Sequence, residues 1–147
     1  MESAPDLVPW ELLVRFHRRA IDQLGGELEE RFGLGIDEYD VLHRLAIAGE
    51  PMRMTDLAAS LLVANSSCTR IVGRLVDLGH VERRAGAEDR RQVLVDLTVD
   101  GRRMYRRMAV EHGRGIRRVL VDHLEPGEGD AISGAMRRVL DALDPAD

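Results

Sequence analysis

Residues 54–98 read MTDLAASLLVANSSCTRIVGRLVDLGHVERRAGAEDRRQVLVDLT, and this stretch decides the fold. It begins with a short helix that has Thr55 as its expected N-cap. The residues that this helix should turn inward are Leu57, Ala58, Leu61 and Leu62. The connection Val63-Ala64 to the next helix is very short, so the two helices must cross steeply. The pattern predicts a helix-turn-helix.

The second helix of this unit is expected over residues 65–78. Its apolar residues recur at i, i+3, i+4 and i+7, which predicts one buried stripe made of Cys68, Ile71, Val72, Leu75, Val76 and Leu78. The opposite side should carry Ser66, Thr69, Arg70, Gly73 and Asp77, with Ser67 and Arg74 at its edge. Small hydroxyl side chains allow a helix to approach a partner closely, and arginine can bind phosphate or guanine edges with two hydrogen bonds.

A two-stranded hairpin should follow, with strands at 81–84 and 92–97. Val93, Val95 and Leu97 alternate with polar residues, as expected of a strand with one buried side. The tip between the strands, residues 85–91, is rich in charge. An arginine-bearing hairpin beside a reading helix is typical of a winged helix, whose tip can enter a minor groove.

Helices flank this unit on both sides. We expect one from Pro9 to Arg31, one that starts at Asp37 and stops before Gly49, and a short third strand at Met52-Arg53. After Thr98 the pattern predicts a long helix to about Leu124, and a last one from Asp130 to Leu143. The first and the last two helices have apolar stripes that are too wide for one winged helix to cover. We therefore expect a two-fold homodimer built from both chain ends.

The chain resembles the MarR (multiple antibiotic resistance regulator) family of winged-helix regulators. The motifs that carry the resemblance are Asp89-x-Arg91 in the wing, Leu97, Thr98 and Gly101 at the start of the next helix, and EYDVL at residues 38–42. It departs from the family pattern at Ala64, Gly73 and Cys68. The resemblance implies a mainly α fold with a small β wing, a single domain over residues 1–147. Dimerisation helices would span about 9–32 and 99–147, and a DNA-binding lobe about 37–98.

The chemistry of these residues predicts sequence-specific binding to double-stranded DNA. The major-groove residues would be Asn65, Ser66, Ser67, Thr69, Arg70 and Arg74. Arg91 would enter the minor groove, oriented by a salt bridge to Asp89, and the phosphate contacts would come from Arg83, Arg84 and Arg90. A dimer would read a near-palindromic operator whose half-sites lie one turn, about 10 bp, apart.

The resemblance also implies a repressor that a small, often aromatic or anionic, effector releases from DNA. The candidate ligand residues are Trp10, His17 and His43, each of which could equally serve packing. Two alternatives stay open: a winged-helix protein-interaction scaffold that binds no DNA, and a redox-responsive regulator in which Cys68, near a helix N-terminus, has a lowered pKa. No catalytic motif, cofactor motif or paired-histidine metal motif is present, so neither an enzyme, a cofactor nor a metal sensor is expected.

The charge of the chain is unevenly distributed. The net charge is −5, but residues 53–107 carry 11 arginines against 7 acids, a local +4, and the remaining residues carry 10 against 19, a local −9. All 21 basic residues are arginine. The positive charge therefore gathers on the predicted DNA-binding stretch. One cysteine, no signal-peptide pattern and no membrane-length apolar run predict a cytoplasmic protein without a membrane partner.

Overall fold

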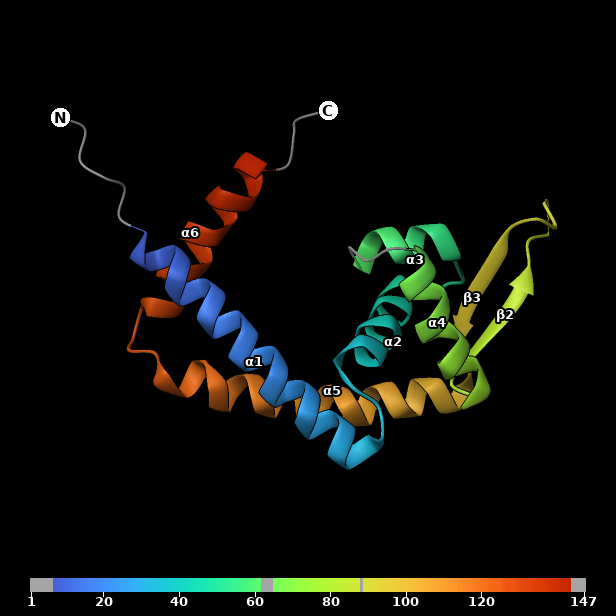
Figure 1. Cartoon of the computed structure of the whole chain (residues 1–147), viewed down its shortest axis with the longest axis horizontal. Coiled ribbons are helices and arrows are strands. Elements are labelled where there is room, and N and C mark those ends of the chain that lie inside the picture. Colours follow the sequence, from blue (N-terminus) through green and yellow to red (C-terminus); the bar gives the residue numbers. More distant parts are fainter. Residues whose placement is uncertain (1–6, 62–64, 88, 144–147) are drawn as a thin grey trace. The chain divides into compact units, whose positions relative to one another are not determined.

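Figure 1 shows the chain as a computed structural model, which describes residues 7–61, 65–87 and 89–143. Two predicted features, the Val63-Ala64 turn and the burial of Leu62, lie outside these residues. Met1–Gly113 and Arg114–Asp147 form separate compact units. Each unit is therefore described by itself.

The first unit contains the winged helix. Its elements are α1 (Val8–Phe32), α2 (Ile36–Ala48), β1 (Met52–Arg53), α3 (Met54–Leu61), α4 (Asn65–Asp77), β2 (Val81–Ala85), β3 (Val93–Leu97) and most of α5 (Val99–Val119). The second unit holds the end of α5, the 3-10 turn η1 (Val121–His123) and α6 (Glu128–Leu143). The predicted fold class, mainly α with a small β wing, is confirmed.

The core of the first unit joins the second half of α1 to α2, α3, α4, β3 and α5. Its most completely buried side chains are Leu28, Leu34, Val41, Leu42, Leu45, Leu57, Cys68, Val72, Leu75, Val95 and Met108. Each of these contributes roughly 1.5–3 kcal/mol through the removal of apolar surface from water. The core therefore fixes which sides of α3 and α4 remain exposed.

The sheet has the strand order β1-β3-β2, and both pairs are antiparallel. Met52 pairs with Val95, so the predicted third strand at Met52-Arg53 is confirmed. Val95 and Leu97 are buried as predicted, whereas Val93 is 42% exposed. Val93 pairs with Ala85 at the distal end of the β2–β3 hairpin, where no core residue covers it.

The start of α5 is closely joined to the turn that follows α4. The Thr98 hydroxyl accepts a hydrogen bond from the Gly101 N–H (3.0 Å) and donates one to the Gly79 carbonyl (2.6 Å). Gly79 has φ +75°, a left-handed conformation that suits glycine after a helix end. Gly101 lies directly against the carbonyl group of His80, where a Cβ atom would overlap the oxygen. Thr98 and Gly101 therefore set where the wing meets the long helix.

Several predicted boundaries need correction. Thr55 is inside α3, which begins at Met54, so Thr55 is not the N-cap. Leu78 is 51% exposed because α4 ends at Asp77 and the chain turns away from the core. The long helix ends at Val119 rather than near Leu124, since a 3-10 turn follows it. The remaining helix boundaries agree with the predicted ones to within two residues.

Both ends of the described chain expose apolar side chains. In α1 and the residue before it they are Leu7, Val8, Trp10, Leu12, Leu13, Val14 and Phe16. In α6, taken by itself, they are Ile132, Val139, Leu140 and Leu143. Apolar surface gathered in this way is typical of interaction sites. In the part of the chain that the structure describes, no helix is long and apolar enough to cross a bilayer.

We predict that Gly101→Ala destabilises the fold. The added methyl group would overlap the His80 carbonyl oxygen, which is backbone and cannot move alone, so we expect a loss of about 1–3 kcal/mol in the free energy of unfolding. Urea denaturation followed by circular dichroism measures it. The control is Gly113→Ala in the same helix, where nothing lies within 4 Å of the new methyl group. Equal unfolding midpoints for the two variants would contradict the close contact.

Candidate nucleic-acid interface

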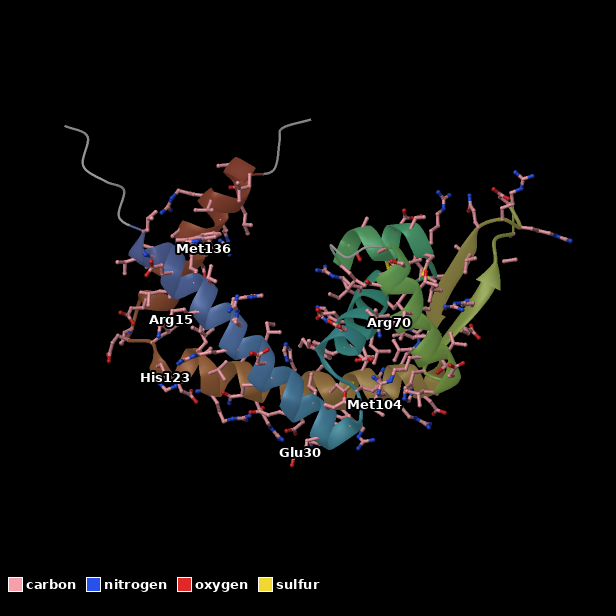
Figure 2. The ribbon with its side chains drawn as sticks, viewed as in Figure 1. Arg15, Glu30, Arg70, Met104, His123 and Met136 are labelled. Atoms are coloured by element: carbon pink, nitrogen blue, oxygen red, sulfur yellow. The ribbon has the colours of Figure 1, made fainter. Side chains whose placement is uncertain are left out.

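One side of α4 is buried and the other side is exposed. Cys68, Val72 and Leu75 are fully buried and Ile71 is 4% exposed. The exposed positions of the helix include Ser66, Thr69 and Arg70, and Arg70 is labelled on α4 in Figure 2. Ser67 is half-buried, and Asn65 is the first residue of α4, with a side chain that lies outside the described part of the structure. The helix thus presents a polar surface with small side chains and one arginine.

Arg74, which was predicted to face the major groove, is held by the protein itself. Its Nη1 lies 2.6 Å from a Glu38 carboxylate oxygen, and its Nη2 lies 2.8 Å from the Gly33 carbonyl oxygen. Nη2 also lies 3.7 Å from a Glu29 oxygen. The guanidinium therefore points to the junction of α1 and α2 and is already engaged there.

Arg83 and Arg84, the predicted phosphate contacts on β2, also have protein partners. Arg83 donates a hydrogen bond to the Thr69 carbonyl (3.1 Å), so the strand supports α4. Arg84 pairs with Asp96 (2.9 Å) and lies 3.6 Å from Glu82. Both side chains remain partly exposed, and the remaining N–H groups of each can still donate to a phosphate.

Asp96 is a structural residue that the sequence reasoning missed. It is only 8% exposed, and its carboxylate accepts hydrogen bonds from Arg84, from Arg102 of α5 (3.2 Å) and from the backbone N–H of Leu97 (2.7 Å). A buried carboxylate needs such partners. Arg102, with its charge unfavourably placed at a helix N-terminus, was the signal that could have revealed the pair. The cluster anchors the base of the wing to α5.

The wing tip keeps two arginines exposed. Arg90 and Arg91 lie at the tip, and Asp89 accepts a hydrogen bond from the backbone N–H of Arg91 (2.9 Å). The salt bridge predicted between the Asp89 and Arg91 side chains is absent from the described residues, so Asp89 shapes the turn and does not orient the guanidinium. Gly86 closes the tip through its N–H bond to the Gln92 carbonyl (2.9 Å).

Cys68 lies within the core. Its Sγ is 3.9 Å from the Met54 sulfur, and burial raises the pKa of the thiol, although Arg83 opposes this effect. The lowered pKa considered from its place near a helix N-terminus is therefore wrong. A buried thiol with a raised pKa is a poor nucleophile, which argues against the redox alternative.

The three candidate ligand residues do not lie together in one site. Trp10 is 67% exposed and His17 is also exposed, both on α1. His43, on α2, hydrogen-bonds through Nδ1 to the Tyr105 hydroxyl (3.0 Å) and stacks on Tyr39 with ring centroids 5.7 Å apart. Only His43 is therefore part of an organised polar cluster.

The cluster around His43 joins α2 to α5. The ring centroids of Tyr39 and His112 lie 4.5 Å apart. The buried Nδ1 of His112 has no hydrogen-bond partner among the described residues. Burial lowers the pKa of His112, and raises the pKa of Tyr39 to about 12. Burial also raises the pKa of the Asp40 carboxyl, while His112, His43 and Arg44 oppose this effect. The cluster thus brings several titratable groups together, with Tyr39 buried, His43 and His112 half-buried and Asp40 at the exposed edge.

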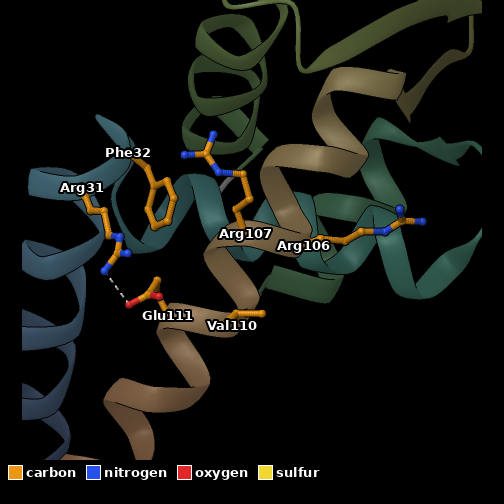
Figure 3. A pocket seen from close by; sticks show the side chains of 6 residues that line it. All are labelled: Arg31, Phe32, Arg106, Arg107, Val110 and Glu111. Atoms are coloured by element: carbon orange, nitrogen blue, oxygen red, sulfur yellow. Dashed lines mark hydrogen bonds and ion pairs between the residues drawn. The ribbon is translucent and has the colours of Figure 1, made fainter.

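A hollow of about 320 Å³ lies on α1 and α5, lined by Arg31, Phe32, Arg106, Arg107, Val110 and Glu111. Figure 3 shows Arg31 paired with Glu111 (2.8 Å) and the Arg107 guanidinium close to the Phe32 ring, 5.4 Å from its centroid. Arg106 points away from Phe32. Two of the three arginines are thus engaged with protein groups.

Across residues 7–61, 65–87 and 89–143 there is no group of three or more histidine, cysteine, aspartate or glutamate side chains that could hold an ion.

Comparisons with known proteins give a consistent result. A sequence model of the MarR family matches residues 32–92. The uncharacterized HTH-type transcriptional regulator YwoH of Bacillus subtilis is 36% identical over 93 residues, 63% of this chain and 66% of its own length, just under two thirds. Two solved transcriptional regulators of Streptomyces coelicolor have similar folds, and the first of them, Sco3205, is a MarR family regulator. Sco3205, in complex with DNA, is 27% identical with a TM-score of 0.86 and coverage of 99% and 92% of the two chains. PcaV, in complex with its natural ligand, is 26% identical with a TM-score of 0.76 and coverage of 97% and 100%.

We predict that stability falls as pH drops below about 6.5, in part through His112. Because burial lowers the pKa of His112 in the folded chain, the unfolded chain binds this proton more tightly, and the free energy of unfolding rises with pH between the two values. Urea denaturation at about pH 7.5 and pH 5.5 should show a smaller difference for His112→Gln than for the unmodified chain. An equal difference in both proteins would mean that His112 does not contribute.

Proposed function

We propose that this chain is a winged-helix transcriptional regulator of the MarR family, and that it binds a near-palindromic operator in double-stranded DNA as a homodimer. The DNA complex of the similar protein Sco3205 supports the proposal. In each copy α4 enters the major groove and the β2–β3 wing reaches the adjacent minor groove.

The observation that carries the proposal is the way the arginines of the lobe divide into two groups. Arg74, Arg84 and Arg102 pair with buried carboxylates of the protein. Arg70, Arg90 and Arg91, by contrast, have neither ion pair nor hydrogen bond from their side chains in the described part of the chain. These three lie on the exposed side of α4 and at the wing tip, which are the two places where a winged helix touches DNA. We therefore assign Arg70 to base contacts, Arg91 to the minor groove and Arg90 to phosphate.

The remaining interface residues follow from their positions. Ser66 and Thr69 accompany Arg70 on the exposed side of α4, with Asn65 and Ser67 at its start. Asp89 shapes the tip, and Arg83 and Arg84 can add phosphate contacts through their spare N–H groups. Arg74 is left out of the DNA-contacting set because its guanidinium is engaged at the α1–α2 junction.

The homodimer accounts for the apolar surface at both chain ends. We assign the helices of residues 9–32 and 99–147 to dimerisation, with the exposed apolar residues of α1 and of α6 in the interface. Residues 37–98 then form the DNA-binding lobe. Two lobes held by one interface present two α4 helices, which matches a near-palindromic site.

We further propose that the protein acts in the cytoplasm as a repressor that a small anionic or aromatic molecule releases from DNA. The ligand complex of the similar protein PcaV supports an effector. His43 is the member of the predicted ligand set with the strongest structural support, because it belongs to the ring cluster between α2 and α5. Trp10, on the exposed surface of α1, and His17 fit the dimer interface better. The scaffold alternative predicts no salt-dependent binding to DNA.

Arg70→Ala should weaken binding to the operator more than binding to random-sequence DNA. The reason is that a base contact discriminates between sequences by about 1–3 kcal/mol, whereas a phosphate contact does not. Fluorescence anisotropy with an operator selected from a random duplex pool measures both affinities. Arg103→Ala is the control, since it removes the same charge from an exposed ion pair with Asp100 on α5. Equal losses on both DNAs would make Arg70 a phosphate contact.

Arg91→Ala should lower operator affinity by about 1–3 kcal/mol, with most of the loss at the A·T pairs under the wing. A narrow A·T minor groove concentrates negative potential, and the exposed guanidinium of Arg91 complements it. Replacement of those pairs by G·C should therefore abolish the difference between Arg91→Ala and the unmodified chain. Arg90→Ala is the matched variant in the same tip and should lower affinity on both DNAs alike. An Arg91→Ala protein with full affinity would show that the wing does not insert.

A further inference from the structure

Arg74 connects three helices through one side chain. It leaves α4 and reaches the carbonyl oxygen of Gly33 just after the end of α1, and the carboxylate of Glu38 in the first turn of α2. A second carboxylate, that of Glu29 in the last turns of α1, lies 3.7 Å from the same guanidinium. A cation near the end of a helix also interacts favourably with the carbonyl groups that the helix leaves unpaired.

Glu38 is shared between two tasks. One carboxylate oxygen accepts the Gly35 backbone N–H (3.0 Å), which caps the start of α2, and the other accepts Arg74 (2.6 Å). Glu38 is 7% exposed, and a buried carboxylate needs such partners. The geometry of α2 and the position of Arg74 are therefore set by the same buried group.

The apolar packing of α4 does not by itself fix the direction of the helix. Contacts of Ile71, Val72 and Leu75 with the core fix which side of α4 is buried, but they are non-directional and define the tilt of the helix axis less strictly than hydrogen bonds do. Charge-assisted hydrogen bonds from a planar guanidinium have a defined direction. The Arg74 bonds lie on the side of α4 that faces the end of α1, whose other half carries the apolar residues assigned to the dimer interface.

We propose that Arg74 is a positioning residue that fixes the direction of α4 relative to α1, and that it thereby sets the half-site spacing which the dimer accepts. The inference rests on the proposed function, because spacing has a meaning only for a dimer that reads two half-sites. It assigns Arg74 a role in specificity without any contact to a base.

The first experiment measures spacing preference. The unmodified chain selects an operator from a random-sequence duplex pool, and affinities are then measured for that operator and for versions with one base pair added to or removed from the spacer. We expect the unmodified chain to discriminate by about tenfold or more, and Arg74→Ala to discriminate by about threefold or less. Circular dichroism and thermal unfolding verify that each variant is folded.

Glu38→Gln separates positioning from DNA contact. Glutamine can still cap α2 through its amide oxygen, but it has no charge to hold Arg74. Glu38 is buried and cannot touch DNA, so a loss of spacing discrimination similar to that of Arg74→Ala supports positioning. The double variant should lose no more than either single variant, since both remove the same interaction. Arg70→Ala is the control, and should lower affinity while the spacing preference stays unchanged.

The outcomes are distinct. Folded Arg74→Ala and Glu38→Gln proteins that keep the full spacing preference overturn the proposal. A second result also overturns it. If Arg74→Ala lowers the affinity for every DNA and weakens its salt dependence, while Glu38→Gln changes neither, Arg74 is a phosphate contact. If the unmodified chain selects no sequence, the proposed function itself fails, which the first step of the experiment reveals before any variant is made.

A measurement without DNA tests the same constraint. A nitroxide attached at Ser66→Cys, on the exposed side of α4, reports the distance between the two α4 helices of a dimer by pulsed electron spin resonance. Cys68 is fully buried, which favours labelling at position 66. Arg74→Ala and Glu38→Gln should each broaden the distance distribution, and Arg103→Ala should not. An unchanged width in both variants would overturn the proposal independently of DNA binding.

Discussion

The burial of one side of α4 is the constraint on which the rest of the structure depends. Cys68, Val72 and Leu75 are completely removed from water, so only one rotation of the helix about its axis is available. That rotation exposes Ser66, Thr69 and Arg70 together. The same core includes Val95 of the wing, so the hairpin is held beside the helix by the apolar contacts that orient it. A polar surface on α4 and an adjacent wing are thus two consequences of one packing arrangement.

Two buried carboxylates decide which arginines remain available to DNA. Glu38 holds Arg74, and Asp96 holds Arg84 and Arg102, because a carboxylate with little access to water needs partners. Among the residues that the structure describes, no acid pairs with Arg70 in this way. A chain with a net charge of −5 can therefore still bind an anion. Glu38 and Asp96 of the lobe are paired with arginines, and most other acids lie outside the lobe, whereas Arg70, Arg90 and Arg91 are exposed on its surface.

The sequence predicts the regular elements well because their signals are local. Hydrophobic periodicity identifies α1 to α6, and the alternation in residues 93–97 identifies β3. Even the two-residue strand at Met52-Arg53 agrees with its prediction. The errors lie where tertiary packing overrides a local pattern. Leu78 fits the apolar stripe of α4 but follows its last turn, and Val93 fits the strand alternation but lies beyond the core.

The site was less predictable than the fold, for a physical reason. A helical wheel shows which side of α4 a residue occupies but not how far a long side chain reaches, and Arg74 reaches back across the helix to the α1–α2 junction. Its partner Glu38 is 36 positions away in sequence. Asp96 and Arg102 are only six positions apart, yet one lies on a strand and the other on a helix, so periodicity does not connect them. Arg91, which pairs with no acid among the described residues, is exposed at the wing tip, as its position in the motif predicted.

Helix α2 connects the Arg74 contacts of α4 with the ring cluster on α5. Its first turn carries Glu38, which binds Arg74 of α4. The next residue, Tyr39, and His43 further along α2 contact Tyr105 of α5. A ligand or proton that prefers another arrangement of those rings can act on α2 only by its difference in affinity for the two arrangements. Any resulting displacement of α2 carries Glu38 with it, and the directional bond to Arg74 converts that displacement into a change in the direction of α4. Apolar contact alone defines the resulting direction of α4 less closely, because it has no preferred direction. The Glu38–Arg74 pair is therefore the point at which a change in the ring cluster can alter what the two α4 helices of the proposed dimer read.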